Sequence, residues 1–381
     1  MRVVVIKFGA IGDMVFTTPL LREVSRFASH VGVLTLPWSR AVYEHHPEVD
    51  RLHLFDPWRA QGFGRVKLAW RIVRELRRER YDLAVILHRS PLAPLLALLA
   101  GIRQRIGFAQ RGGRLLLTGA VPFDGERHEV LRNLSVLEAI GREGALGSLV
   151  PRTEMFLPQE TSLDPFFRKK AGADDSVIGL FPGGGVNPGM TFAYKRWPVE
   201  KFARLAQRLV ADGHRVAIFG GREDEELCHA VQEAIGGVGY WGIGRSLAEF
   251  GRSVQRCALF VGGDTGPLHI AAAVGTPTLA LFGPTDPRLV APLGELHRVM
   301  RLELPCSPCY LHGKPGDCRE EHRCMRELEV EAVWERVQEM IGQRSEGVGA
   351  QGMDEASGAS DRENRREGES AEVRAALGGE A

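Results

Sequence analysis

The chain has 381 residues, of which 44% are hydrophobic and 25% charged, so it is long enough for two ordinary domains and has a globular composition. Residues 1–150 contain 22 Lys and Arg against 14 Asp and Glu, a net charge of +8, which leaves −7 for the remainder. The basic half predicts an acidic partner, such as a phosphorylated glycan, an anionic membrane surface or nucleic acid, unless its arginines merely solvate helix faces.

The absence of several sequence features limits where the protein can be located and which partners it can bind. Lys7, Gly9 and Asp13 interrupt the apolar N-terminus too early for a signal peptide, and no run reaches the ~18 apolar residues that a membrane span needs. No zinc-finger or RNP pattern is present, and no basic stripe is interleaved with aromatic residues. We therefore expect a cytoplasmic protein without a nucleic-acid partner, with peripheral membrane contact left open.

Strand and helix patterns alternate along the first half of the chain. Apolar runs predict strands at 2–7, 31–36, 51–55, 83–87 and 105–108. Amphipathic or apolar stretches predict helices at 14–28, 67–80 and 94–100. Such alternation indicates a parallel sheet with helices on both faces.

A second α/β cycle follows a less periodic stretch at 151–176, which contains three prolines. Strands are predicted at 177–181, 215–219, 257–261 and 278–282, and helices at 199–212, 224–235, 247–256 and 268–274. We expect an α/β protein with two doubly wound, Rossmann-like domains, 1–160 and 175–342, facing a cleft. Residues 343–381 have few large apolar side chains and predict a disordered polar tail.

Glycine-rich turns follow four of the predicted strands, at 9–13, 183–195, 220–223 and 262–269. Ligands of open α/β sheets bind at the carboxyl ends of the strands, so these turns mark the expected binding edge. No GxGxxG follows the first strand and no GxxxxGK[ST] occurs anywhere, which disfavours dehydrogenases and P-loop enzymes.

The segment 261–287 is the most informative of the four regions. A strand runs into Gly262-Gly263, and a helix then begins near Gly266, so bare backbone N–H groups face the strand end. Asp264 can cap the helix or hold a sugar hydroxyl, Thr265 can donate to a phosphate, and His269 lies one turn on. The pattern predicts a diphosphate or nucleotide site, with an ordinary capped α/β crossover as the alternative.

Asp13 is the lone carboxylate of the first glycine turn. It can accept a proton from an attacking hydroxyl, or it can simply be the N-cap of the first helix. Thr17 can orient Asp13 or line the cleft.

Other polar residues at strand ends extend this interpretation. Lys195 can neutralise a departing diphosphate and Thr191 can bond a phosphate oxygen, although Lys195 also fits a surface lysine at a helix start. Glu223 can accept the two hydroxyls of a ribose, with Asp224 as a rival and helix capping as the alternative for either.

Four of the six cysteines are clustered, with the spacing C-x2-C-x8-C-x5-C. They are Cys306, Cys309, Cys318 and Cys324. The spacing fits no common zinc signature, so a structural metal site, reduced thiols and a disulfide all stay open.

Several motifs together resemble the glycosyltransferase family 9 heptosyltransferases, which act with ADP-heptose on lipopolysaccharide. They are IKFGAIGD at 6–13, TTPL at 17–20, KRWP at 195–198, GDTGPLHIAAA at 263–273, TPT at 276–278, LFGPTDP at 281–287 and CSPC at 306–309. The resemblance covers roughly residues 1–340 in order. It implies a GT-B fold and metal-independent transfer with inversion, requiring no cofactor beyond the ADP-heptose donor, to a lipid-linked core acceptor at the inner face of the inner membrane.

The resemblance also implies roles for individual residues. Asp13 matches the general base, Lys195 the phosphate-binding lysine, and Glu223 the ribose-binding glutamate. The diphosphate turn falls on Asp264, Thr265, Gly266 and His269. The basic N-terminal half is expected to bind the acceptor, with Gly12, Thr17, Arg59, Arg65, Arg111 and Arg114 as candidates beside Lys67, Arg103 and Arg105.

Two other functions fit the same architecture. One is a nucleotide-sugar epimerase or phosphorylase, and the other is a non-catalytic lipopolysaccharide-binding protein.

Overall fold

The structure is a computed structural model of the chain. It describes residues 1–59, 62–109, 112–142, 151–159, 164–168, 176–187, 190–310, 318 and 320–348. Met1–Trp334 forms one compact unit and Glu335–Ala381 a second.

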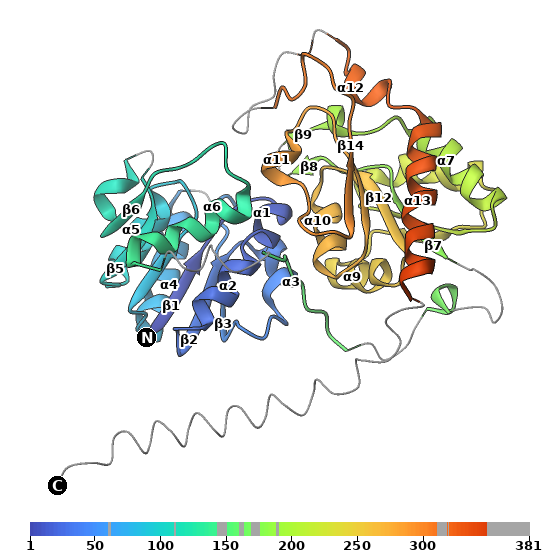
Figure 1. The fold of residues 1–381 in the computed structure, drawn as a ribbon. Coiled ribbons are helices and arrows are strands. Elements are labelled where there is room, and N and C mark those ends of the chain that lie inside the picture. The colour runs from blue at the N-terminus through green and yellow to red at the C-terminus, as the bar shows by residue number, and fades with distance from the viewer. Residues whose placement is uncertain are drawn as a thin grey trace. The chain divides into compact units, whose positions relative to one another are not determined.

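The first sheet has six parallel strands in the order β3-β2-β1-β4-β5-β6 (Figure 1). Its strands are β1 (Arg2–Ile6), β2 (His30–Thr35), β3 (Arg51–Leu54), β4 (Leu83–Ile86), β5 (Gln104–Phe108) and β6 (Gly119–Val121). The order reverses between β1 and β4, which makes that pair the switch point where ligands bind in such sheets.

The second sheet repeats this plan with the order β11-β10-β7-β12-β13-β14. Its strands are β7 (Val177–Phe181), β10 (Arg215–Gly220), β11 (Tyr240–Ile243), β12 (Leu259–Gly263), β13 (Thr278–Leu281) and β14 (His297–Met300). Its switch point lies between β7 and β12. The predicted α/β class with two doubly wound sheets is therefore confirmed.

Helices cover the sheets because alternate strand residues point to opposite faces. In β1, Val3 and Val5 join one buried cluster, and Val4 and Ile6 join another. The helices of the first half are α1 (Ile11–Val15), α2 (Thr18–Ser25), α3 (Arg40–Tyr43), α4 (Phe63–Glu79), α5 (Leu92–Leu99) and α6 (Glu129–Ser135). Those after it are α7 (Val199–Ala211), α8 (Glu225–Ala234), α9 (Leu247–Gln255), α10 (Gly266–Ala273), α11 (Pro287–Val290), α12 (Arg323–Arg326) and α13 (Val330–Val348), beside a short hairpin of β8 (Val186–Asn187) and β9 (Met190–Thr191).

The single helix predicted at 14–28 is wrong. The structure divides it into α1 and α2, because Pro19 has no N–H to continue the ladder. The hydroxyl of Thr17 donates to the carbonyl of Met14 at 2.7 Å, and that of Thr18 donates to the carbonyl of Val15 at 2.9 Å. The bond from Thr18 satisfies the Val15 carbonyl, which lacks the N–H that Pro19 cannot supply, while the Met14 carbonyl also accepts from the N–H of Thr17 at 3.0 Å.

The C-terminal boundary also differs from the prediction. Helix α13 continues to Val348, six residues into the predicted disordered tail, whose remainder lies outside the described residues. None of the described helices is both long enough and apolar enough to cross a membrane.

We predict that a chain ending at Val348 keeps the turnover and the thermal unfolding midpoint of the full chain. Residues 349–381 are rich in Gly, Glu, Ser and Ala, and such a composition cannot bury enough apolar surface to add a core. Differential scanning calorimetry and a turnover assay of both chains test this. A lower midpoint in the shorter chain would contradict it.

Candidate functional site

Three of the four glycine turns that the sequence singled out lie at the two switch points, and the fourth, at 220–223, follows β10 beside β7. Residues 9–13 follow β1 in the first sheet, while the loop 182–195 and the turn at Asp264 follow β7 and β12 in the second. Since these two turns of the second sheet leave adjacent parallel strands, their side chains meet at one edge.

Asp264 is the centre of a buried ion group at this edge. Its Oδ2 accepts a 2.8 Å hydrogen bond from Lys195 Nζ, and its Oδ1 lies 3.3 Å from His269 Nε2. Burial opposes the charge of Asp264, but the Lys195 ammonium and the His269 ring outweigh it and hold the pKa of the carboxyl well below its usual range. The side chains of Lys195 and Asp264 are 14% and 9% exposed.

The N-terminus of α10 carries no side-chain cap. Its N-cap is Thr265, whose hydroxyl donates to the carbonyl of Gly263 at 3.3 Å. Asp264 bonds Lys195 instead of the helix amides, so the capping alternative for Asp264 is wrong. The first-turn amides are left for water or for an anion.

Aromatic rings surround Lys195. Its Nζ lies 4.7 Å from the ring centre of Tyr310 and 5.9 Å from that of Phe192, within the range of cation–π attraction. Burial raises the pKa of Tyr310, and the charges of Lys195, Asp13 and Asp264 are all close enough to act on that hydroxyl. Tyr310, which the sequence did not single out, therefore has both predicted catalytic residues within electrostatic range.

Asp224 and Glu223 have different surroundings. Asp224 is 1% exposed, and it accepts hydrogen bonds from the backbone N–H groups of Gly184 at 2.9 Å and Gly221 at 3.0 Å. It thus joins two of the glycine turns, and Arg196 lies 3.5 Å from it. Glu223 is exposed at the end of β10 and is the carboxylate of the two that a ligand can reach. The side chain of Thr191 lies outside the described residues.

Asp13 is the third residue of α1 and not its N-cap, which is Ala10. Its Oδ2 accepts a long, 3.3 Å hydrogen bond from the N–H of Ala10, and the side chain is partly exposed. Asp13 therefore caps the helix only weakly and remains accessible to a ligand.

A buried group of charges lies beside Asp13, and the sequence analysis did not identify it. Lys7 Nζ donates to Glu129 Oε1 at 2.8 Å, and Glu129 also pairs with Arg132. Burial lowers the pKa of Lys7 to about 8, against the attraction of Asp13 and with help from Arg132 and Arg89. The available signal was a lysine ending an apolar strand directly before a glycine turn, because lysine is seldom buried unless it is paired.

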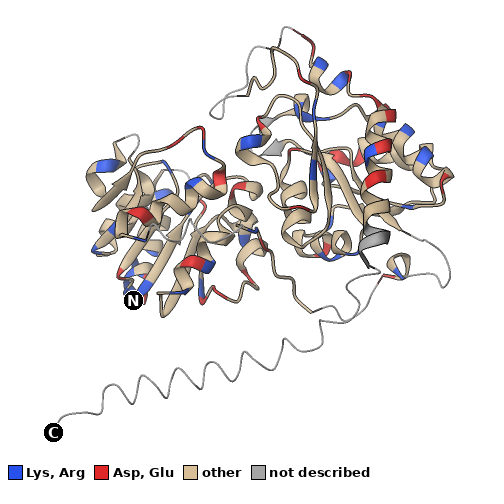
Figure 2. Cartoon of the chain, viewed as in Figure 1, with Lys and Arg blue, Asp and Glu red and all other residues tan. Residues whose placement is uncertain are grey.

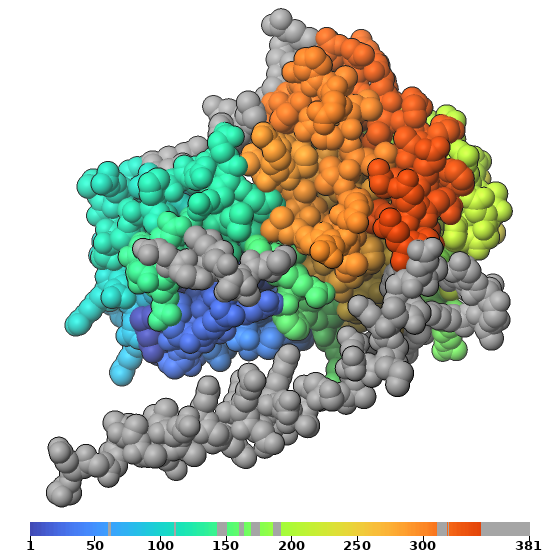
Figure 3. Space-filling view, viewed as in Figure 1, coloured from blue at the N-terminus to red at the C-terminus, as the bar shows by residue number. Residues whose placement is uncertain are grey.

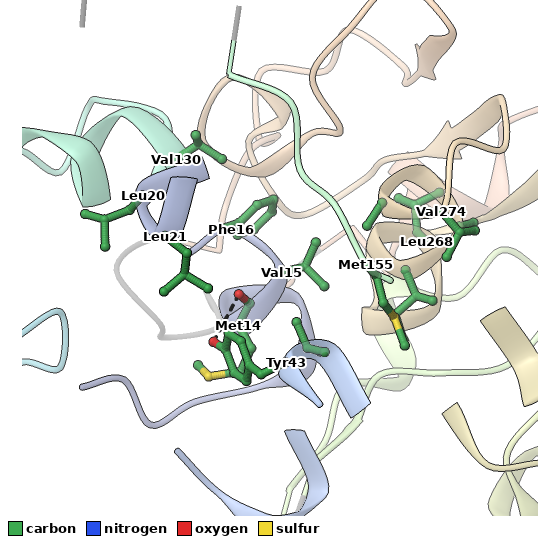
Figure 4. Close-up of a cluster of buried hydrophobic side chains, with 14 of the residues drawn as sticks. Met14, Val15, Phe16, Leu20, Leu21, Tyr43, Val130, Met155, Leu268 and Val274 are labelled. Carbon is green, nitrogen blue, oxygen red and sulfur yellow. Dashed lines mark hydrogen bonds between the residues drawn. The ribbon is translucent and has the colours of Figure 1, made fainter. Parts of the chain in front are cut away.

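Helices α1 and α10 make direct contact at two glycines. A Cβ on Gly12 would lie 2.7 Å from Cδ2 of His269, and one on Gly266 would lie 3.1 Å from Cβ of Ile11. Phe16 also meets the His269 ring edge-on, with centres 4.6 Å apart. Figure 4 shows Val15 and Phe16 among the buried apolar side chains that include Leu268 of α10. The contact brings the start of α1, with Asp13, to the start of α10, with Asp264.

Thr17 does not line a cleft. It is completely buried, and its hydroxyl bonds the carbonyl of Met14 and the hydroxyl of Tyr43, the latter at 2.8 Å. The break between α1 and α2 turns this side chain inward, so its predicted acceptor contact is wrong.

The candidate arginines of the basic half fall in different places. Arg59 and Lys67 line a groove of about 760 Å³ with Arg71, Arg74 and Arg78 of α4. Pro37 also lines it, and the next residue, Trp38, donates its indole N–H to the carbonyl of Gly9 at 3.4 Å, so the segment after β2 contacts both the groove and the Asp13 turn.

Arg65, Arg103 and Arg114 lie elsewhere on the surface of the first half, and Arg111 lies outside the described residues. Arg105 has a structural part, because its guanidinium donates to the carbonyls of Ile102 and Leu116 at 2.6 and 2.7 Å. Figure 2 colours the basic residues blue.

The four clustered cysteines are free thiols. Burial raises the pKa of Cys309, and the charges of Cys318 and Cys306 add to that rise. Within the described ranges no three His, Cys, Asp or Glu side chains are arranged to hold a metal, so the structural-metal alternative gains no support from the geometry.

Comparison with known proteins shows which family this chain belongs to. The model of glycosyltransferase family 9 (heptosyltransferase) matches residues 69–318. This chain belongs to glycosyltransferase family 9. The expectation of an enzyme is thereby confirmed, and the non-catalytic alternative is set aside.

Relatives and solved structures agree with the family assignment. Lipooligosaccharide heptosyltransferase 2 of Haemophilus influenzae is 26% identical, with 79% of this chain and 89% of that protein covered. Lipopolysaccharide heptosyltransferase 2 of Escherichia coli is 28% identical, with coverage of 79% and 88%. A family 9 glycosyltransferase structure from Veillonella parvula matches with a TM-score of 0.73 at 22% identity, over 90% of this chain and 97% of that one. The structure of E. coli ADP-heptose heptosyltransferase II matches with a TM-score of 0.67 at 24% identity, over 91% and 100%, which confirms the expected GT-B fold.

We predict that Asp264→Asn lowers the free energy of unfolding by about 3 kcal/mol, because it removes the countercharge of a mostly buried lysine. The folded-state pKa of Asp264 is depressed, so its stabilisation is present above the unfolded-state pKa of ~4 and is lost as the pH falls below it. The difference between the wild type and the variant should therefore shrink in acid.

Urea unfolding at several pH values tests this. Glu44→Gln is the matched control, because Glu44 pairs with Arg40 on the surface, where an ion pair contributes less than ~1 kcal/mol. An equal loss of unfolding free energy in the two variants would show that the Lys195–Asp264 pair stabilises the fold no more than a surface ion pair does.

Proposed function

We propose that this family 9 enzyme transfers heptose from ADP-heptose to the inner core of lipopolysaccharide, with inversion at the anomeric carbon and without a metal. The observation that supports this most directly is the contact between α1 and α10, which brings the turn of Asp13 to the Lys195–Asp264–His269 group. The sugar and the acceptor are those in the names of the related heptosyltransferases, and one structural neighbour is a heptosyltransferase with ADP-2-deoxy-2-fluoro heptose.

The chemistry begins at Asp13. Its partly exposed carboxylate takes the proton of an acceptor hydroxyl while that oxygen attacks the anomeric carbon. The bond between the sugar and the diphosphate breaks as the new glycosidic bond forms. Attack from the face opposite the diphosphate inverts the configuration.

Lys195 and the uncapped amides of α10 stabilise the leaving group. Negative charge grows on the diphosphate as its bond to the sugar breaks, and Lys195 and the start of α10 offer fixed positive charge at one place. These two features supply the role that a metal ion fills in other enzymes, so we propose a metal-independent reaction. In this proposal Glu223, which is exposed beyond β10, accepts the ribose hydroxyls of ADP.

The groove of Arg59 and Lys67 is the proposed acceptor site. Pro37 of its lining precedes Trp38, which bonds the Asp13 turn, and its cations suit the phosphate and carboxylate groups of a lipopolysaccharide core. A lipid-linked acceptor places the enzyme, in this proposal, at the cytoplasmic face of the inner membrane.

We expect Asp13→Asn to lower kcat by at least ~10²-fold, the lower range for loss of a general base, with ADP affinity nearly unchanged. Asp50→Asn is the control, because Asp50 is an exposed carboxylate at the opposite, amino-terminal edge of the same sheet. Steady-state kinetics with ADP-heptose and a truncated lipopolysaccharide acceptor give the comparison. Wild-type turnover in Asp13→Asn would contradict the role of Asp13 as the general base and would leave it only the weak bond to the N–H of Ala10.

Lys195→Ala and Thr265→Ala should both weaken the binding of ADP, because they remove groups at the proposed diphosphate position. Loss of a charge-assisted contact should raise the Kd by ~10-fold or more for Lys195→Ala. Isothermal titration calorimetry with ADP, with and without EDTA, measures both the loss and the metal independence. Unchanged affinity in both variants would exclude this edge of the second sheet as the donor site.

The acceptor proposal predicts selective changes in KM. Arg59→Gln and Lys67→Gln should raise the acceptor KM and leave the donor KM unchanged. Added salt should do the same, because it screens charges beyond ~8 Å at physiological ionic strength. Equal salt sensitivity of the two KM values, without an effect of these variants, would rule the groove out.

A further inference from the structure

Exposed apolar side chains are concentrated on one part of the first half of the chain. Of the 13 large apolar residues exposed among the described residues, eight lie between positions 58 and 115. They are Trp58, Phe63, Val66, Trp70, Leu95, Leu98, Leu99 and Leu115. A surface rich in large apolar side chains marks an interaction site in most globular proteins.

Helix α4 has two apolar faces. Its core face is Ile72, Val73 and Leu76, which are buried against the first sheet. Phe63, Val66 and Trp70 repeat at i, i+3 and i+7 and therefore share another face, on which Phe63 is 90% exposed. No packing inside the described chain accounts for this second stripe.

Helix α5 continues the surface. Its sequence, LAPLLALL, is apolar on every side, and a helix of that kind is normally buried all round. Here Ala93, Leu96 and Ala97 pack into the core, while Leu95, Leu98 and Leu99 stay about 40% exposed.

Direct contacts join these elements into one surface. Arg77 of α4 donates to the carbonyl of Leu99 at the end of α5, at 2.7 Å. The turn that carries Leu115 approaches the start of α5, since a Cβ on Gly113 would lie 3.6 Å from Pro94. We call the outer sides of α4, α5 and this turn the α4–α5 surface, which belongs to the N-terminal half drawn in blue to green in Figure 3.

The charges of the α4–α5 surface indicate what covers it. Helix α4 carries six Lys and Arg against two Glu, and its two acidic residues already have basic or histidine partners. Arg74 lies one helical turn beyond Trp70, so a positive charge lies next to the exposed aromatic side chains on the same face of α4. Aromatic side chains beside Lys and Arg are typical of protein surfaces that bind the interface of an anionic bilayer.

We propose that the α4–α5 surface docks on an anionic lipid bilayer, with Phe63, Val66, Trp70 and the leucines of α5 entering the interface and the basic residues of α4 contacting lipid phosphates. This deepens the proposed action on a lipid-linked acceptor, on which its biological purpose rests. The groove of Arg59 and Lys67 shares α4 with this surface, so docking would present the acceptor site at the membrane.

Vesicle binding of the full chain tests the proposal. The probes are vesicles of phosphatidylcholine alone and vesicles of phosphatidylcholine and phosphatidylglycerol in equal parts, with binding measured by co-sedimentation. The wild type should bind the anionic vesicles and bind them less as salt rises. Phe63→Ser combined with Trp70→Ser should lower the partition coefficient by ~10-fold or more, since both side chains lose interfacial burial.

Val238→Ser combined with Leu296→Ser is the matched control, because it removes two exposed apolar side chains outside the α4–α5 surface and should bind like the wild type. Turnover with a delipidated, soluble acceptor should be the same in all three proteins, which shows that the variants fold.

Wild-type vesicle binding by Phe63→Ser/Trp70→Ser, or no binding by the wild type, would overturn the proposal while leaving the transferase activity intact. A concentration-dependent dimer that this variant abolishes would overturn it as well, in favour of a second copy of the chain. Vesicle binding without any transfer would count against the proposed function and not against this surface.

Discussion

The site depends on the close contact between helices α1 and α10. A Cβ on Gly12 would clash with the His269 ring and one on Gly266 would press tightly on Ile11, so the two glycines let the helix starts approach each other directly. Asp13 follows Gly12, and Asp264 lies two residues before Gly266, so this contact brings the proposed base near the proposed donor-binding group. Any larger side chain at Gly12 would displace the His269 ring and, through it, the hydrogen bond to Asp264.

Buried charge organises both sides of that contact. Lys195, Asp264 and His269 form one compensated group, and Lys7, Glu129 and Arg132 form another beside Asp13. Such groups cost desolvation energy, so they contribute little net stability, but they fix the direction of each charge before a ligand arrives. Because these charges are already oriented, they can stabilise the negative charge that grows on a leaving diphosphate without first rearranging.

The sequence predicted the doubly wound plan because buried parallel strands are apolar throughout, as in β1, β4 and β7. It did not predict β6, β11 and β14, which are short or partly exposed and lack that signal. Residues at strand ends, such as Asp13, Asp264 and Glu223, could be selected from glycine turns. The partners Glu129, Arg132 and Tyr310 could not, because they come from distant segments that only the fold brings near. Thr17 was misplaced because a helix break that depends on Pro19 decides which way it points.

The sugar-transfer reaction is the centre of this account, and one product analysis tests it. The full chain is incubated with ADP-heptose and a truncated lipopolysaccharide acceptor in EDTA, and the products are separated and examined by mass spectrometry and NMR. The account predicts one ADP released for each new glycosidic bond, with the anomeric configuration inverted relative to the donor. An altered free sugar without a new bond would indicate the epimerase or phosphorylase alternative. A retained configuration would contradict direct displacement assisted by Asp13.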